Sequence, residues 1–464
     1  MKNLVLIFLA VTVIILVLIV FKNNNEQQDI YVAVDGNDEQ DGSKLLPLRT
    51  LKKAASIAEA GTTVHIREGI YEEKLVVQHS GTKSKEIIFK PYKNEQVILS
   101  GKNLKIEEGD TSIITIDNKN YVTISGLIIQ DLKTDLADET VIGVFVTGSS
   151  SHITLDSNHV QRIETHAEEG NGHGIAIYGT GSMKDITITN NIVEDLKLGA
   201  SEALVLNGNI DGFKIEHNLV RRNNNIGIDL IGYEGVASDK KADFVRNGVV
   251  SHNTVHNIST YGNPAYGEEY SAGGIYVDGG RDITIEKNTI YQSDIGIEAT
   301  SEHKGKYAEN IDIINNTIYE NFYTGIAIGG YDEERGGTIH SFISQNKLYR
   351  NDTKGLDGGQ LMIQHDVRNN TIDQNILSAG PSRIFIANYF TTNENNELRH
   401  NVFHKEEGEK GIWVWKDEDF ATFSKFKIAS NSDTETSYID PNYVDPSSHD
   451  FRLKEDSLAR DIIE

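Results

Sequence analysis

Three acidic side chains occupy related places in a short motif, Gly-Ile-x-Φ with Φ apolar, that recurs near the middle of the chain. The motif reads GIDLIG at 227–232, GIYVDG at 274–279 and GIEATS at 296–301. Side chains of a strand alternate between its two faces, so each motif Ile points inward while Asp229, Asp278 and Glu298 point outward. Two carboxyl groups several ångströms apart can hydrolyse a glycosidic bond, one as proton donor and the other as base or nucleophile. We therefore predict Asp278 and Glu298 as a catalytic pair, with Asp229 as a third catalytic residue that tunes their pKa values or binds a sugar hydroxyl.

The motif also occurs in flanking segments, and there the outward places are apolar. GIAIYG (174–179), EALVLNG (202–208) and GIAIGG (325–330) put Ala176, Leu204, Leu206 and Ala327 outward. Neighbouring strands lie about 4.8 Å apart and alternate residues of one strand about 6.6 Å apart, so Asp278 is expected roughly 8 Å from Asp229 and from Glu298. Unpaired acids this close destabilise a sheet and push carboxyl pKa values apart. The alternative is that all three are ordinary solvated acids on the surface of an acidic protein.

Loops rich in tyrosine flank these motifs at 233–247, 259–273 and 300–310. Flat, amphipathic tyrosine rings suit stacking on sugar faces, although loop tyrosines also serve to pack loops onto a scaffold. The predicted substrate-binding residues are Tyr233, Tyr266, Tyr270, Tyr276, His303 and Lys304. For His303, and for His173 beside the acid-bearing strands, a solvated or structural role is the alternative.

A second repeat predicts the scaffold that positions these residues. Nine stretches combine a β-rich run, an Asn and a further apolar residue, and their asparagines are 158, 191, 218, 253, 288, 316, 346, 375 and 401, with spacings from 26 to 35 residues. Such a period is typical of a solenoid, and the alternation of β-branched with polar residues makes its units strands. Asn at one turn tolerates left-handed geometry and can bond the coils above and below. The fold class predicted is all-β, a right-handed parallel β-helix solenoid with an N-terminal capping helix.

Bulk composition narrows the function classes. The 464 residues carry a formal charge of −25, which argues against nucleic acid as a partner. A bare acidic polymer is also disfavoured unless a cation such as Ca²⁺ mediates. The chain has no Cys, which excludes disulfides and a thiolate zinc site. A capped solenoid of this kind is expected to be a monomer.

The first residues predict a membrane attachment. Leu4–Phe21 are 18 consecutive residues with only Thr12 polar, which is long enough to span a bilayer. We expect residues 1–22 to be a signal anchor, 23–29 a linker and 30–464 one parallel β-helix domain. The protein would then lie on the cell membrane as a single-pass protein with its bulk extracellular, or be secreted if the segment is cleaved.

The start of the predicted domain resembles a known group of proteins. Tyr31–Tyr71 follows the pattern YVxxxGxDxxDGSxxxPxxTLxxAxxxAxxGTTVxIxxGxY of secreted β-helical carbohydrate-active proteins, including a group of pectate lyases. Within it, Thr50 is expected to cap a helix that covers the open end of the solenoid and ends at Gly61. Residues 436–461 resemble the closing segment of the same proteins and are expected to fold back as a cap. The resemblance implies the fold and extracellular work on sugars.

Two further resemblances concern the reaction. The run from Gly274 to Gly305 is similar to the catalytic stretch of β-helical β-xylosidases, which implies Asp278 as nucleophile and Glu298 as acid/base. The departure IEATSEH around Glu298 leaves Glu302 as a rival proton donor. The pectate lyases instead hold a calcium cluster and use a Lys as base. Here 223–234 retains Asp229, but Asn225 and Ile226 stand where acids are expected, and no Lys takes a central outward place; Lys304 and Lys306 are loop residues.

The predicted function is an extracytoplasmic enzyme that cleaves a polysaccharide or oligosaccharide, a glycoside hydrolase with paired carboxylates. The alternatives are a Ca²⁺-dependent uronate (pectate-like) lyase and a non-catalytic surface glycan-binding solenoid. No cofactor is required by the hydrolase, whereas the lyase would need Ca²⁺, for which Asp229, Glu234 and Asp278 offer hard oxygen ligands.

Overall fold

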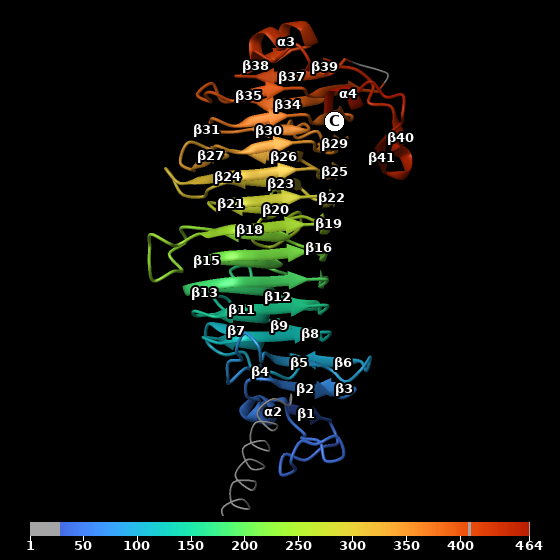
Figure 1. Ribbon diagram of the computed structural model, residues 1–464. Helices are drawn as coiled ribbons and strands as arrows, with labels where there is room; N and C mark the ends of the chain where they lie inside the picture. The colour runs from blue at the N-terminus through green and yellow to red at the C-terminus, as the bar shows by residue number, and fades with distance from the viewer. Residues whose placement is uncertain (1–27, 407–409, 464) are drawn as a thin grey trace, which may run out of the picture.

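The protein is an elongated stack of coils whose strands pair in parallel from one coil to the next (Figure 1), and only β37–β38 and β40–β41 pair antiparallel among the described residues. The structure, a computed structural model, describes residues 28–406 and 410–463. A large sheet of 26 strands forms two faces of the stack, because β13 and β15 run without a break round the corner between them. A second sheet of 13 strands forms the third face. These parallel sheets are what the Asn and Gly-Ile repeats predict.

The large sheet comprises β1 (Gln28–Val32), β2 (Thr62–Ile66), β4 (Leu75–Val76), β5 (Ile87–Pro91), β7 (Asp110–Asp117), β8 (Asn120–Ser125), β10 (Thr140–Thr147), β11 (Ser151–Asp156), β13 (Asn171–Thr189), β15 (Leu204–Glu216), β17 (Ile228–Ile231), β18 (Val245–Ser251), β20 (Gly273–Asp278), β21 (Arg281–Glu286), β23 (Ile295–Thr300), β24 (Tyr307–Ile314), β26 (Thr324–Ile328), β27 (Gly337–Ile339), β28 (Phe342–Ser344), β30 (Leu361–Ile363), β31 (Val367–Arg368), β32 (Thr371–Asp373), β34 (Ile384–Asn388), β35 (Glu397–Arg399), β37 (Ile412–Trp415) and β38 (Glu418–Phe420). The second comprises β3 (Gly69–Tyr71), β6 (Val97–Ser100), β9 (Ile128–Thr134), β12 (His159–Thr165), β14 (Ile192–Glu194), β16 (Leu219–Asn223), β19 (Thr254–Ile258), β22 (Thr289–Tyr291), β25 (Thr317–Tyr319), β29 (Lys347–Tyr349), β33 (Ile376–Ala379), β36 (Val402–Lys405) and β39 (Ser437–Tyr438).

The Gly-Ile-x-Φ motifs form one continuous row of strands. The inward residues stack from coil to coil in the order Ile175, Leu204, Ile228, Ile275, Ile297, Ile326 and Leu361, and all are buried in the core. The prediction was wrong by one residue in the coil at 202–208. Leu204 and Leu206 point inward beside Ile175 and Ile177, so the outward side chains there are Val205 and Asn207.

The nine repeated asparagines form the predicted internal ladder. In every step the side-chain amide of one Asn donates to the Oδ1 of the next, at 3.0–3.1 Å from Asn158 through to Asn401. Each amide also donates to a main-chain carbonyl of the coil before. The left-handed residue is not the Asn but its predecessor, for example His217 or Lys287, which leaves the amide free to point into the coil.

A short helix lies at the N-terminal end of the stack (Figure 1). Helix α2 (Leu51–Ile57) begins after Thr50, whose hydroxyl accepts the Lys53 N–H as expected of an N-cap. It ends at Ile57, earlier than the predicted stop at Gly61, because the chain is already extended at Ala58. That this helix closes the end of the solenoid stays a prediction.

The C-terminal segment folds back along the side of the stack rather than over its end (Figure 1). Its elements are β40 (Tyr443–Asp445), η1 (Pro446–Ser448), β41 (Asp450–Leu453) and α4 (Arg460–Ile463). Tyr443 and Phe451 pack on Tyr319 and Tyr349 of the second sheet. The last coil is covered instead by the preceding helix α3 (Phe423–Ser430), whose Phe426 stacks on Trp413 with ring centroids 5.3 Å apart.

The expected signal anchor, residues 1–22, lies outside the described residues. Strand β1 begins at Gln28, so the last two residues of the expected linker already pair with β2, Gln28 with Thr62 and Asp29 with Thr63. No helix within the described ranges is long and apolar enough to cross a membrane.

The ladder gives a direct test of the fold. Asn288→Ala removes the acceptor for both the backbone N–H and the side-chain amide of Asn253, and it frees the carbonyl of Val250. Because buried polar groups left without partners cost about 1–3 kcal/mol each, we expect a loss of roughly 2–4 kcal/mol in the free energy of unfolding. Urea denaturation followed by circular dichroism measures it.

The matched control for this prediction is Asn103→Ala, which removes an exposed Asn with one surface hydrogen bond, to Glu72. Its expected change is below about 0.5 kcal/mol. If both variants unfold at the wild-type urea concentration, the ladder does not stabilise the stack.

Candidate active site

A cavity of about 720 Å³ opens on the face formed by β15, β17, β20, β23 and their loops. Seven of its lining residues are acidic: Glu202, Asp229, Glu234, Glu269, Asp278, Glu298 and Glu302. Five are tyrosines: Tyr178, Tyr266, Tyr276, Tyr323 and Tyr331. No Lys, Arg or His belongs to the lining in the part of the chain that the structure describes. The site is therefore strongly acidic and carries the aromatic surface that a sugar can contact.

The three predicted acids share the floor of this cavity. Strand pairing places Asp229 beside Tyr276 and Tyr276 beside Glu298, in one row across β17, β20 and β23. Asp229 and Glu298 are thus two strand spacings apart, about 10 Å between Cα atoms, and Asp278 stands diagonally to both at roughly 7–8 Å. The expected convergence on consecutive coils is confirmed.

Their exposure differs from the prediction. Asp229, Asp278 and Glu298 are only 2%, 3% and 7% exposed, so they do not face open solvent. The side chains that rise around them from the neighbouring loops, among them Glu234, Tyr266 and Tyr331, enclose the sheet surface. Sequence alternation tells which face a side chain takes, but not how far a loop covers that face.

Asp278 and Glu298 have unlike surroundings. Asp278 Oδ1 accepts the backbone N–H of Glu302 at 2.7 Å, a contact that favours its ionised form. Glu298 receives no hydrogen bond from any described residue, although it is buried on the adjacent strand. Asp229 Oδ1 accepts the N–H of Leu230 at 2.8 Å. One carboxyl of the pair is therefore held in place by a donor, and the other is free to interact with a ligand.

Burial and mutual repulsion raise the pKa values of these acids. Loss of water raises the pKa of Glu298 to about 8, and the nearby charge of Glu302 adds to it. Burial also raises the pKa of Asp278 well above its usual range, against the lowering effect of the Glu302 N–H. For Asp229 burial is again the main cause, followed by the charges of Glu202 and Asp278. Such shifts are found where carboxyl groups exchange protons near neutral pH.

Glu302, the rival proton donor, is committed to other contacts. Its Oε1 accepts the Tyr276 hydroxyl at 3.1 Å, and its Oε2 accepts the Tyr331 hydroxyl at 3.1 Å and Arg335 Nε at 2.7 Å. The Arg335 guanidinium also lies 4.6 Å from the Tyr331 ring centre. Both oxygens of Glu302 thus act as acceptors in a rigid network, which suits a positioning role better than proton donation.

Four of the predicted substrate-binding residues lie outside the cavity lining. Tyr233 packs against Phe244 under Lys306, and Tyr270 stacks on Tyr261. His303 Nε2 lies 3.0 Å from Glu234 Oε1, and Lys304 Nζ lies 3.0 Å from Glu334 Oε1. Tyr266 and Tyr276 do line the cavity. A contact of the other four with substrate stays a prediction.

Sequence reasoning missed Glu202, although it singled out the neighbouring His173. Glu202 precedes β15, and burial raises its pKa to about 8, with a further contribution from Glu234. His173 Nδ1 lies 3.1 Å from the main-chain oxygen of Glu202, and its Nε2 lies 3.2 Å from the Tyr178 hydroxyl. The available signal was the motif EALVLNG itself, whose correct register puts an acid at the start of the coil before Asp229.

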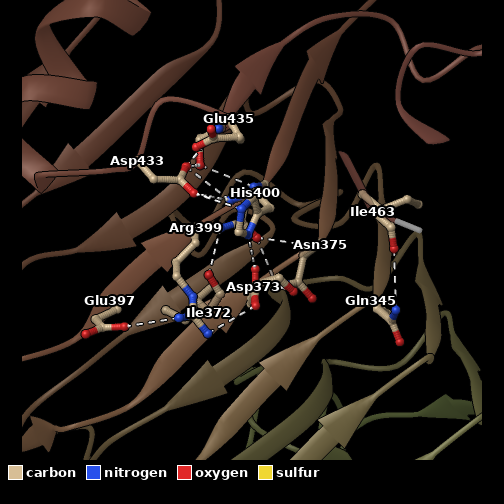
Figure 2. A network of polar contacts seen from close by, with 12 residues as sticks. Gln345, Ile372, Asp373, Asn375, Glu397, Arg399, His400, Asp433, Glu435 and Ile463 are labelled. Carbon is tan, nitrogen blue, oxygen red and sulfur yellow. Dashed lines mark hydrogen bonds and ion pairs between the residues drawn. The ribbon is translucent and has the colours of Figure 1, made fainter. Parts of the chain in front are cut away.

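The expected calcium ligands do not form a ready-made three-ligand site. Among the described residues, the group of three whose ligand atoms lie within 4.8 Å of one another is His400, Asp433 and Glu435, and not Asp229, Glu234 and Asp278. Figure 2 shows that His400 is already engaged by carboxylates on both sides. Its Nδ1 lies 2.9 Å from Asp373 and its Nε2 lies 3.4 Å from Asp433. This network ties β32 to the segment after α3.

Comparison with known proteins places the chain among β-helix proteins. Residues 30–224 match the family described as "Pel9A-like, right handed beta helix region", and residues 247–431 match "Right handed beta helix region". The chain is 56% identical over 435 residues to uncharacterized protein YwoF of Bacillus subtilis (strain 168), across 94% of this chain and 92% of that protein. It is 31% identical over 104 residues to pectate lyase PEL9 of Emericella nidulans, across 20% of this chain and 25% of that protein.

A solved structure shares the fold. The GH136 lacto-N-biosidase from Eubacterium ramulus matches with a TM-score of 0.50 and 13% sequence identity. The match covers 83% of this chain and 65% of that chain, so this chain spans just under two thirds of it. At this identity the likeness concerns the fold alone.

The buried acids predict a pH dependence of stability. The folded-state pKa of Glu298, about 8, lies above its unfolded value, so its protonated form favours folding. This contribution is complete below the unfolded pKa and is lost as the pH rises through about 8. Glu298→Gln removes the titration, so we expect it to unfold at a higher urea concentration than wild type at pH 8.5 and at a similar one at pH 5.

Glu168→Gln, which changes an exposed acid, is the control and is expected to follow the wild type at both pH values. Equal stability of Glu298→Gln and wild type at pH 8.5 would contradict the raised pKa.

Proposed function

The chain belongs to the pectate-lyase-like superfamily of right-handed β-helix proteins, and we propose that it is an enzyme that hydrolyses glycosidic bonds of a polysaccharide or oligosaccharide. The observation that carries this proposal is the pair of buried carboxyl groups, Asp278 and Glu298, on adjacent strands of one sugar-sized cavity. Glycoside hydrolysis needs two carboxyl groups in different protonation states. The Glu302 N–H favours the ionised form of Asp278 and has no counterpart at Glu298, which supports this difference although burial raises the pKa of both groups.

Glu298 is the proton donor in this proposal. With a pKa of about 8 it keeps its proton at neutral pH, and its carboxyl group makes no hydrogen bond to any described residue. It can therefore protonate the oxygen of the leaving sugar, which lowers the barrier to breaking the glycosidic bond.

Asp278 is the base or the nucleophile. The Glu302 N–H stabilises its carboxylate, and the Tyr276–Glu302–Tyr331 network fixes the loop that carries this N–H. A carboxylate here either attacks the sugar carbon or activates a water for that attack. Asp229 shares the floor and repels Asp278, which helps to keep one acid of the cluster protonated.

The acidic lining supports hydrolysis over the alternative, a Ca²⁺-dependent uronate lyase. No Lys or Arg of the described chain lines the cavity, and the loop lysines Lys304 and Lys306 are engaged by Glu334 and by the Tyr233 ring. A uronate carboxylate would enter among seven acids without a compensating cation. The lyase would need both a base and a metal supplied in some other way.

We place this activity outside the cytoplasm. The apolar run at 4–21 supports attachment of the enzyme to the cell membrane by residues 1–22, with the β-helix facing outward. Cleavage of that segment would release the same enzyme into the medium.

The proposal is tested with the full-length chain in mild detergent against neutral, amino and uronic glycans, with and without chelator. New reducing ends that survive chelator, without ultraviolet absorbance from an unsaturated product, are expected. Asp278→Asn and Glu298→Gln should each lower kcat/KM by at least about 100-fold, because positioned acid–base groups contribute that much or more. Wild-type activity should fall above about pH 8, where Glu298 loses its proton.

Asp282→Asn is the control, because Asp282 is exposed on the next strand and lies outside the cavity lining. It should keep wild-type activity. If the products absorb in the ultraviolet and form only without chelator, the protein is a lyase and not a hydrolase. Sugar binding without any cleavage would favour the non-catalytic binder, and full activity of both pair variants would refute the site assignment.

A further inference from the structure

Glu202, which is partly buried, and Asp229, which is buried, form a second pair of acids in the cavity, and the proposed hydrolytic step does not use Glu202. They stand on neighbouring coils, since Val205 of β15 pairs with Asp229 of β17, and both line the cavity. The side chain of Glu202 is 13% exposed. Both carboxyl groups belong to the lining of one cavity, and after burial the charge of Glu202 makes the next largest contribution to the raised pKa of Asp229.

No positive charge of the described chain neutralises this pair. Asp229 has one donor, the Leu230 N–H, which is uncharged. His173 Nδ1 lies 3.5 Å from Glu202 Oε2. Burial lowers the pKa of His173 to about 4, so its ring is neutral at physiological pH. Without a cation such acids stay protonated, so a ligand that brings a positive charge is the one that stabilises their ionised form.

The wall next to this pair also offers an acceptor. The side-chain oxygen of Asn207, a lining residue, is buried and has no hydrogen-bond partner among the described residues. Asn207 lies on β15, the strand that Glu202 precedes. A ligand that fits this end of the cavity therefore brings several N–H or O–H donors and few acceptors.

We propose that Glu202 and Asp229 form a subsite for the protonated amino group of an amino sugar within the glycan. This inference rests on the proposed function for the presence of a sugar in the cavity. An ammonium group brings one positive charge and three N–H donors, which matches two repelling carboxyl groups. A hydroxyl brings no charge, an N-acetyl group removes the charge, and a uronate adds charge of the wrong sign.

The test compares methyl glycosides that differ in one group: glucosamine with glucose and N-acetylglucosamine, and galactosamine with galactose and N-acetylgalactosamine. Calorimetric titration of the full-length chain at pH 6.5 should show at least one amino sugar binding about tenfold more tightly than both its partners, since a hydrogen bond to a charged group contributes about 1.5–3 kcal/mol. Buffers of different ionisation heat should reveal proton release with the amino sugar only, because the ammonium favours the ionised acids. Added salt should weaken that binding most.

Variants separate the subsite from the rest of the cavity. Glu202→Gln should reduce the amino-sugar preference by about tenfold, and Asp229→Asn provides a second test if the first variant folds poorly. Glu168→Gln, exposed and outside the cavity lining, is the control. The subsite is refuted if no amino sugar is preferred over its partners, or if both variants keep the preference.

Failure of this inference can be told from failure of the hydrolase. Cleavage of a neutral glycan that depends on Asp278 and Glu298, with no amino-sugar preference, would refute the subsite and support the hydrolase. The opposite result is an amino-sugar preference that Glu202→Gln abolishes, in a protein that cleaves none of the amino, neutral or uronic glycans. It would support the subsite and refute the hydrolase.

Discussion

The register between coils is the constraint on which the rest of this structure depends, and buried asparagine amides hold it. Each ladder Asn before the last donates to the Asn of the next coil and to a carbonyl of the coil before, as Asn253 does with Asn288 and Ile215. These bonds form only when coils stack with one Asn above another. A slip by one residue would turn every strand side chain to the opposite face and leave the amides unpaired in the core. The ladder therefore contributes specificity of register as well as free energy.

That register brings residues of separate coils together in one site. Asp229, Tyr276 and Glu298 come from three coils spread over 70 residues of chain, yet they form one row because the ladder aligns β17, β20 and β23. The inward Ile row beneath the acids is fully buried and closely packed, so the strands that carry the acids resist displacement. Rigid support of this kind is what allows like charges to be held together against their repulsion, and what allows catalytic groups to keep a productive geometry.

The loops then change the chemistry of the row. Without them the acids would be solvated and would titrate in the ordinary range of carboxyl groups. The loop after β23 supplies the N–H that holds Asp278 and the carboxylate that binds the Tyr276 hydroxyl, and Arg335, from a later loop, fixes Glu302 in turn. Burial under these loops raises the pKa of Glu298 to about 8. The scaffold thus fixes the positions of the acids, and the loops determine their protonation states.

Sequence reasoning predicted the solenoid, the nine ladder positions and the inward Ile row, because periodic patterns report directly on local strand geometry and on stacking between equivalent residues. It also placed Asp229, Asp278 and Glu298 on one surface. It put Leu204 on the wrong face, because this coil lacks the Gly-Ile pair that identifies the inward residue in the other coils. It did not predict that the acids are buried, that Glu202 joins them in the cavity, or that Tyr233 and Tyr270 lie outside the cavity lining. These features depend on how loops from different coils pack over one another, and such contacts between distant residues leave no periodic trace in the chain.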